Sequence, residues 1–279
     1  MYKITKKQIL NNTTVLIEVA APDVAQKVEP GQFVVIRIDE TGERIPLTIA
    51  DYDKCKGTVT VIAQMIGYST KMLGTLNPDD RIMNITGPLG KPSELDGYEN
   101  VAVIGGGVGC AIAYPQAKYL YRKGARVDII AGFRNKNLVI LEEEMKLACS
   151  ELYITTDDGS YIEKGFVTEK LQKLIDLKNN YDLVIAIGPI VMMRAVSEVT
   201  RPYGISTVVS LNPIMIDGTG MCGCCRVTVG GRTRFACVDG PDFNAHEVDF
   251  NTLLKRNNAY RQQEAEWAEH DCRIFGRNT

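Results

Sequence analysis

The sequence predicts a small antiparallel β-barrel, then an α/β domain with a doubly wound parallel sheet, then a short cysteine-rich segment. Residues 1–97 contain short β-branched runs separated by Gly, Pro, Asn and Asp clusters, a pattern typical of antiparallel barrels. Residues 98–211 alternate apolar strands with helical stretches, which indicates a parallel sheet with helices on both faces. Residues 212–249 carry four of the eight cysteines, and residues 250–279 form a charged tail rich in helix formers.

The individual elements follow from periodicity and from the positions of turn residues. In the first domain the sequence predicts strands at 14–20, 32–38 and 57–63 and a helical turn at 68–73. In the second domain it predicts strands at 101–104, 126–131, 152–155, 183–187 and 206–210, with helices at 111–122, 138–148, 167–175 and 190–198. In the third it predicts a hairpin whose strands, 226–229 and 232–236, flank a Gly-Gly turn.

Composition narrows the class of protein. The chain has 279 residues, enough for two domains with cores of their own, and its net charge of -2 gives no electrostatic reason to expect nucleic acid or an anionic membrane as a partner. No apolar run reaches the length of a transmembrane helix, and no apolar stretch follows the basic N-terminal residues as it would in a signal peptide. The cysteines outside the third segment are scattered, which does not indicate a disulfide framework, so we expect a cytoplasmic protein.

The most specific pattern is Asp217-x4-Cys222-x2-Cys225-x11-Cys237. Two irons bridged by two sulfides need four protein ligands, and thiolates are the ligands that such clusters prefer. We therefore predict a [2Fe–2S] cluster on these four residues and treat the adjacent Cys224 as a non-ligand. Structural zinc is the main alternative, although zinc sites favour two paired Cys or His modules, and an inert cysteine-rich loop is the other.

Two glycine-containing turns follow strands of the predicted parallel sheet. Because ligands collect at the carboxyl ends of such strands, and helix N-termini attract phosphate, both turns are candidate nucleotide sites. A tight turn without a ligand is the alternative interpretation. The candidate residues are Gly105, Gly106, Gly107, Val108 and Gly109 in the first turn, and Gly188 and Pro189 in the second.

The order of a barrel followed by a nucleotide domain resembles the ferredoxin–NADP reductase family. Arg44-Ile-Pro-Leu-Thr48 is similar to the flavin motif of that family, and Gly67-Tyr-Ser-Thr70 is similar to its second flavin motif. The resemblance implies a bound FAD, with Thr48 next to the reactive N5 of the ring. The residues implied to bind FAD are Arg44, Pro46, Leu47, Thr48, Gly67, Ser69 and Thr70.

The same resemblance extends to the nicotinamide nucleotide. The segment from Gly188 to Met192 is similar to a Cys-Gly-Pro-x-x-Met motif, with Ile187 where many relatives have Cys, and Asp157 lies in a loop similar to one near the adenosine. From the residues alone, Arg134 and Lys136 favour a 2′-phosphate and hence NADP. The family resemblance implies NAD(H), with Arg134 pairing with the diphosphate instead.

The segment from Asp217 to Cys237 resembles the cluster segment in the small subunit of NADH-dependent reduced ferredoxin:NADP oxidoreductases. The related electron-transfer subunit of dihydroorotate dehydrogenase has Cys where this chain has Asp217. This resemblance implies electron transfer between NAD(H), FAD and the cluster within an electron-bifurcating hetero-oligomer, whose larger flavin and iron–sulfur subunit is the partner. The predicted tail, with Tyr260 and Trp267, packs either on that partner or on its own domain.

Two other functions use the same residues. One is the diaphorase module of a hydrogenase or of dihydroorotate dehydrogenase, which differs in its partner. The other is a regulatory module that senses redox state and nucleotide without turnover.

Overall fold

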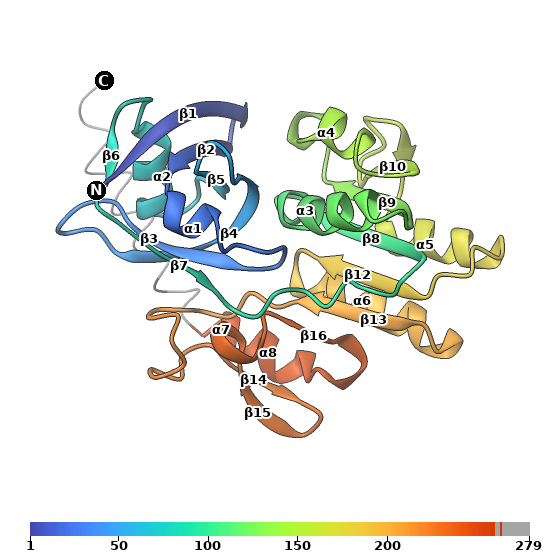
Figure 1. The fold of residues 1–279 in the computed structure, drawn as a ribbon. Coiled ribbons are helices and arrows are strands. Elements are labelled where there is room, and N and C mark those ends of the chain that lie inside the picture. The colour runs from blue at the N-terminus through green and yellow to red at the C-terminus, as the bar shows by residue number, and fades with distance from the viewer. Residues whose placement is uncertain (260–262, 264–279) are drawn as a thin grey trace.

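The computed structural model describes residues 1–259 and 263, and it contains two seven-stranded sheets and one two-stranded hairpin. Figure 1 shows the first sheet on one side, the second on the other, and the segment after β13 below both. The predicted fold class, an antiparallel barrel followed by a parallel α/β domain and a small C-terminal segment, is confirmed.

The first sheet is a nearly closed antiparallel barrel with strand order β6-β1-β2-β5-β4-β3-β7. Its interior holds the alternate apolar side chains of the strands, such as Val15, Ile17 and Val19. Its elements are β1 (Tyr2–Asn11), β2 (Thr14–Ala20), α1 (Pro22–Ala25), β3 (Phe33–Arg37), β4 (Arg44–Asp53), β5 (Thr58–Gln64), α2 (Tyr68–Thr75), β6 (Arg81–Ile82) and β7 (Asn84–Leu89).

Strand β1 was not predicted from the sequence. It is a long polar strand near the edge of the sheet, and most of its side chains face solvent, although Ile4 is fully buried. It forms because it pairs antiparallel with β2 along almost its whole length, so tertiary pairing overrides a weak local preference.

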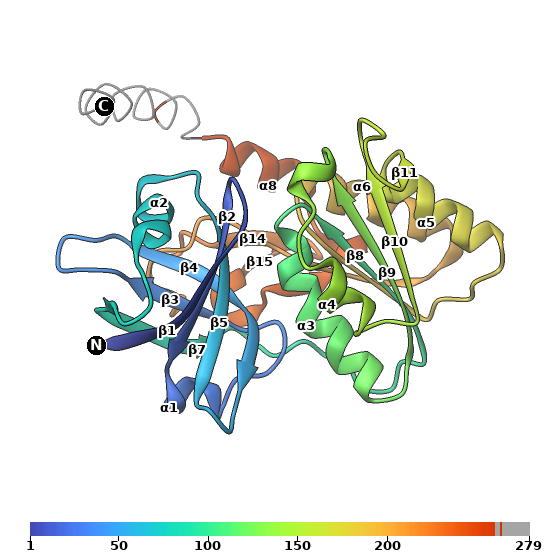
Figure 2. The ribbon, with the colours of Figure 1, turned by 90° about the horizontal axis from the view of Figure 1, so that it is seen from above.

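The second sheet has the order β11-β10-β9-β8-β12-β13-β16, and its strands are parallel except for β16 (Asp242–Asn244). Helices α3 and α4 pack on one face and α5 and α6 on the other (Figure 2). Its elements are β8 (Asn100–Gly106), α3 (Gly109–Arg122), β9 (Arg126–Phe133), α4 (Glu142–Lys146), β10 (Glu151–Thr156), β11 (Glu163–Lys164), α5 (Val167–Asp176), β12 (Leu183–Ile187), α6 (Ile190–Thr200) and β13 (Ser206–Ser210).

The prediction of a helix at 138–148 is wrong for the first part of this range. A 3-10 turn, Lys136–Leu138, is followed by extended backbone at Val139 and by a left-handed Leu141 with φ of 56°. Ile140 and Leu141 are both buried in the core, and the non-helical backbone at 139–141 allows this burial. Helix α4 therefore begins only at Glu142.

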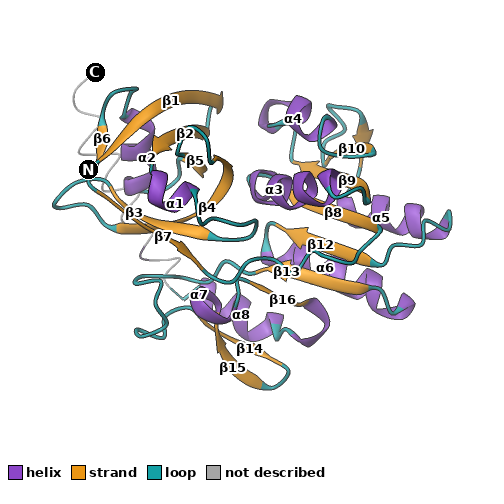
Figure 3. Ribbon diagram, viewed as in Figure 1, coloured by secondary structure: helices purple, strands orange, loops and turns teal. Residues whose placement is uncertain are grey.

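The third segment contains the predicted hairpin, formed by β14 (Arg226–Val229) and β15 (Arg232–Phe235), which is confirmed. Figure 3 shows the short helices that follow it: α7 (Ala236–Asp239) and α8 (Phe250–Asn257), with β16 (Asp242–Asn244) between them. Through the pair Val209↔Phe243, β16 extends the second sheet, an anchorage that was not predicted.

The predicted tail begins with α8, and the rest of that prediction, including Tyr260 and Trp267, lies outside the described residues. Among the helices that the structure describes, none combines the length and the apolar character needed to cross a bilayer.

The carboxyl group of Asp242 is enclosed where the barrel exit, α3 and β16 meet, although the residue as a whole is half-buried. Its Oδ2 accepts hydrogen bonds from Ser93 Oγ at 2.6 Å and Gln116 Nε2 at 3.3 Å. Its Oδ1 and Gln116 Oε1 have no partner among the described residues. Burial raises the pKa of this carboxyl above its usual range, although the hydrogen bonds oppose the rise.

This raised pKa makes the stability depend on pH. The folded state favours the neutral carboxyl, so ionisation destabilises it as the pH rises above about 4. We expect Asp242→Asn, a neutral replacement of the same shape, to exceed the wild type in free energy of unfolding near pH 7 by about 1–3 kcal/mol. The difference should shrink toward pH 4 in urea titrations. Asp23→Asn, at an exposed position, is the control, and parallel pH profiles for wild type and Asp242→Asn would contradict this account.

Candidate functional site

A cavity of about 780 Å³ lies between the barrel and the carboxyl ends of the parallel strands. The barrel contributes Gln64 and Ile66, just after β5, and the sheet contributes both of the predicted glycine turns. The predicted residues that line it are Gly106, Gly107, Val108, Gly109, Arg134, Asp157, Gly188, Pro189 and Met192.

The two glycine turns pack directly against each other. A Cβ atom on Gly106 would lie 2.5 Å from Met192 Sδ, and one on Gly109 would lie 2.3 Å from the Ile187 carbonyl oxygen. Gly107 has φ of 57°, which L side chains rarely adopt, and no atom lies within 4 Å of its Cβ position. Gly106 and Gly109 therefore allow the first turn to pack closely against the second. At Gly107, glycine allows the positive φ, and the space beside it is open.

The charged residues that line the cavity are one cation, Arg134, and one carboxylate, Asp157. Lys136, the second cation considered from the sequence, does not line the cavity, and its Nζ lies 5.2 Å from the centre of the Tyr161 ring. The cavity is thus less basic than the sequence indicated.

Many residues that line this cavity were not predicted from the sequence, among them three that contribute from outside the glycine turns. Phe166, at the start of α5, is 58% exposed, and Gln64 and Ile66 come from the other domain. The aromatic Phe166, directly before a predicted helix at the carboxyl edge of the sheet, could have indicated a residue of the nucleotide site. No local pattern connects the end of β5 with the glycine turns.

The first flavin motif lies on a stretch of β4 that is open on one side. Residues 44–48 pair with β3, as in Val35↔Pro46 and Phe33↔Thr48, whereas pairing with β5 begins only at Ile49↔Val61. Over these residues the backbone groups that face β5 have no strand partner, so they are available to a planar ligand. Because Gln64, at the end of β5, lines the cavity, this open stretch leads toward it.

The second flavin motif forms the start of α2. Gly67 is its N-cap in extended conformation, and Thr70 Oγ1 donates to the Gly67 carbonyl at 3.0 Å. Ser69 is buried, and its Oγ donates to Glu43 Oε2 at 2.8 Å, so the sequence also missed Glu43 as part of this site. With both hydroxyls engaged, the donors left for a phosphate are the backbone N–H groups of the first turn.

In the loop of residues 217–225, called the cysteine-rich loop below, the side chain of Asp217 fixes the backbone through hydrogen bonds. Its Oδ1 accepts the Thr219 N–H at 2.9 Å and its Oδ2 accepts the Cys222 N–H at 3.0 Å. These backbone hydrogen bonds, that of Thr219 first, lower the pKa of the carboxyl although burial opposes them. Gly218, Gly220 and Gly223 all have positive φ, which lets the loop reverse direction between its ligand candidates.

Two of the four predicted ligands lie together. The Sγ atoms of Cys225 and Cys237 are 3.1 Å apart, and both residues are buried as free thiols. Burial and then the adjacent Cys225 sulfur raise the pKa of the Cys237 thiol to about 12. Cys222 is exposed. In residues 1–259 and 263 no three His, Cys, Asp or Glu side chains converge as a metal site.

The donor set nevertheless fits a two-iron cluster. The buried thiols of Cys225 and Cys237 could bind one side of the cluster. The thiol of Cys222 and the carboxylate of Asp217 lie on a nearby loop that contains three glycines with positive φ. Closing the set requires Cys222 and Asp217 to turn toward the buried pair.

The cysteine-rich loop packs on the barrel at Gly218. A Cβ atom there would lie 2.8 Å from Leu89 Cδ1 and 3.2 Å from Val35 Cγ2. Val35 is the cross-strand partner of Pro46 in the first flavin motif. The loop is therefore one strand away from that motif.

Comparison with known proteins agrees with this arrangement. The iron–sulfur cluster binding domain of dihydroorotate dehydrogenase B matches residues 212–249. A dihydroorotate dehydrogenase B (NAD(+)) electron transfer subunit homolog from Thermotoga maritima is 46% identical over 244 residues, which cover 88% of this chain and 86% of the relative. The electron transfer subunit from Geobacillus thermodenitrificans is 34% identical, covering 88% of this chain and 96% of the relative.

Among solved structures, one chain of an NADH-dependent reduced ferredoxin–NADP oxidoreductase, studied for flavin-based electron bifurcation, superposes with a TM-score of 0.91. It is 42% identical in sequence, and the match covers 97% of each chain.

The close contact at Gly109 generates a prediction about stability. We expect Gly109→Ala to lower the free energy of unfolding by about 1–3 kcal/mol, because its Cβ would overlap the β12 backbone. Gly67→Ala is the matched control, since no atom lies within 4 Å of the Cβ position. Both variants are compared with wild type by urea titration after bound nucleotides are removed. Equal effects of the two substitutions would show that the contact does not constrain this turn.

Proposed function

Because this chain belongs to the family of dihydroorotate dehydrogenase B electron-transfer subunits and their homologues, we propose that it passes electrons between NAD(H), FAD and a [2Fe–2S] cluster. The observation that carries this proposal is that three candidate cofactor sites adjoin. The open stretch of β4 leads to the nucleotide cavity on one side, and its neighbour β3 contacts the cysteine-rich loop on the other.

The nucleotide cavity holds NAD(H) in this proposal. The backbone N–H groups at residues 105–109 and the start of α3 bind the diphosphate. The turn from Gly188 through Met192 supports the nicotinamide, and Phe166 offers a face for the adenine. Asp157 favours a ribose 2′-hydroxyl, and Lys136 is held at Tyr161, so the cavity supports NAD over NADP.

The barrel holds FAD, which supplies the conversion between a two-electron hydride and single electrons. Arg44 pairs with the flavin phosphate, and Gly67, Ser69 and Thr70 present the N-terminus of α2 to it. Pro46, Leu47 and Thr48 lie on the stretch of β4 that β5 leaves open, so they would hold the flavin ring, and the hydroxyl or N–H of Thr48 would supply a hydrogen-bond donor to it. Hydride transfer then needs stacking and alignment, with no general acid or base.

Asp217, Cys222, Cys225 and Cys237 are the proposed ligands of the cluster. A zinc ion on the same residues is less consistent with the structure, because only one pair of thiols lies together and no second Cys or His module joins it among the described residues.

Four exposed apolar side chains lie in or near the cysteine-rich loop, and they suit a protein partner. Met221, next to Cys222, is 90% exposed, and Ile214, Ile216 and Val238 are also exposed. Exposed apolar groups of this kind are characteristic of interface cores. We propose that a larger subunit with its own flavin and iron–sulfur groups docks here. In such a bifurcating complex, this chain would be the small subunit that exchanges electrons with NAD(H). A hydrogenase or dihydroorotate dehydrogenase partner would use the same surface.

Turnover with an artificial acceptor tests this function. The purified chain should oxidise NADH and reduce a one-electron dye, with a higher kcat/KM for NADH than for NADPH. A regulatory module that only senses nucleotide and redox state predicts no dye reduction with either nucleotide, and that result would overturn the proposal.

The role of Asp217 is tested by Asp217→Cys. We expect the variant to keep its iron content, because four ligands remain, while the absorption and EPR spectra of the cluster change with the new ligand. Cys224→Ser is the matched control and should leave both spectra unchanged. If Asp217→Cys and wild type give the same spectra, Asp217 does not coordinate iron.

A further inference from the structure

Two arginines hold the loop that contains the proposed cluster ligands. Arg226 Nη1 donates to the Gly223 carbonyl at 3.1 Å, and Arg256 Nη2 donates to the Cys224 carbonyl at 3.0 Å. Both carbonyls lie between Cys222 and Cys225 in sequence, so two cations contact the same four-residue stretch. No motif in the sequence predicted that either arginine belongs to this site.

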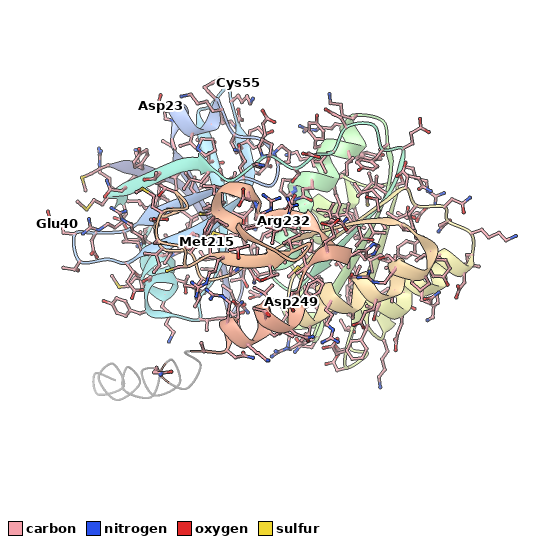
Figure 4. The ribbon with its side chains drawn as sticks, turned by 90° about the horizontal axis from the view of Figure 1, so that it is seen from below. Asp23, Glu40, Cys55, Met215, Arg232 and Asp249 are labelled. Atoms are coloured by element: carbon pink, nitrogen blue, oxygen red, sulfur yellow. The ribbon has the colours of Figure 1, made fainter. Side chains whose placement is uncertain are left out.

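The two arginines come from separate elements that are fixed independently. Arg226 begins β14, where it is paired with Phe235 of β15. Arg256 lies on α8, whose Phe250 and Leu253 are buried and whose first turn is capped by Asp249 through the Thr252 N–H at 3.0 Å. The hairpin and Asp249 are visible on the face shown in Figure 4, where Arg232 and Asp249 are labelled.

Within residues 1–259 and 263, the charge of each arginine has no carboxylate partner. In the part of the chain that the structure describes, neither guanidinium forms an ion pair with a carboxylate.

A guanidinium stays charged at every pH relevant to proteins. An iron–sulfur cluster gains one negative charge when it is reduced, so a fixed positive charge beside it stabilises the reduced form. We propose that Arg226 and Arg256 set the reduction potential of the cluster, raising it so that the cluster accepts electrons more readily. This inference rests on the proposed function, since it requires the cluster to be present.

The test is an EPR-monitored redox titration of the full chain with its cofactors. Arg226→Gln and Arg256→Gln each remove the charge but keep a donor for the carbonyl. We expect each to lower the midpoint potential, with a fall of about threefold to tenfold in the equilibrium constant for reduction, where tenfold is about 59 mV for a one-electron couple. Arg226→Lys and Arg256→Lys keep the charge and should stay near the wild-type value.

Arg232→Gln is the matched control, because it removes the same charge from the same hairpin at the end away from the loop. A control shift as large as that of Arg226→Gln would assign the effect to net charge and overturn the proposal. Unchanged potentials in both loop variants, or equal shifts for Gln and Lys, would also overturn it.

Loss of the cluster from both Gln variants would assign the arginines an anchoring role in place of the electrostatic one. A wild-type protein without any two-iron EPR signal would instead refute the proposed function itself, so the two failures are distinguishable.

Discussion

The close packing of the cysteine-rich loop on the barrel at Gly218 is the constraint on which the proposed electron path depends. Leu89 and Val35 fill the space where a side chain on residue 218 would lie, so glycine is needed for this approach. The contact places the proposed ligands next to β3, the strand that pairs with the flavin motif. If the loop were displaced, the flavin and cluster sites would no longer adjoin.

Several weaker links keep the three parts in this arrangement. Lys118 of α3 forms an ion pair with Asp51 of β4 at 2.7 Å, which joins the helix that follows the first glycine turn to the strand that carries the flavin motif. The pair is partly exposed, so its own contribution to stability is small. The pairing of β16 with β13 attaches the third segment to the nucleotide sheet, and the carboxylate of Asp242 connects that strand to α3 and to the barrel exit.

Local patterns in the sequence predicted the hairpin, the glycine turns and eight strands of the two large sheets, because each of these depends on residues that are close in the chain. The predicted strands are β2, β3, β5, β8, β9, β10, β12 and β13. The sequence did not predict β1, which exists through pairing with β2, or the extended start of the 138–148 segment, where burial of Ile140 and Leu141 prevails over helical periodicity. The contributions of Gln64, Ile66 and Phe166 to the cavity arise only when separate elements meet. The hydrogen bonds from Arg226 and Arg256 likewise join elements that no local motif relates.

The most direct test of the electron path is the visible absorption and EPR spectrum of anaerobically purified protein, recorded before and after addition of NADH. We expect flavin bands that bleach with NADH and a two-iron signal that appears in the reduced protein without any other subunit. A colourless protein containing zinc would contradict it and would leave a nucleotide-binding module with a structural metal.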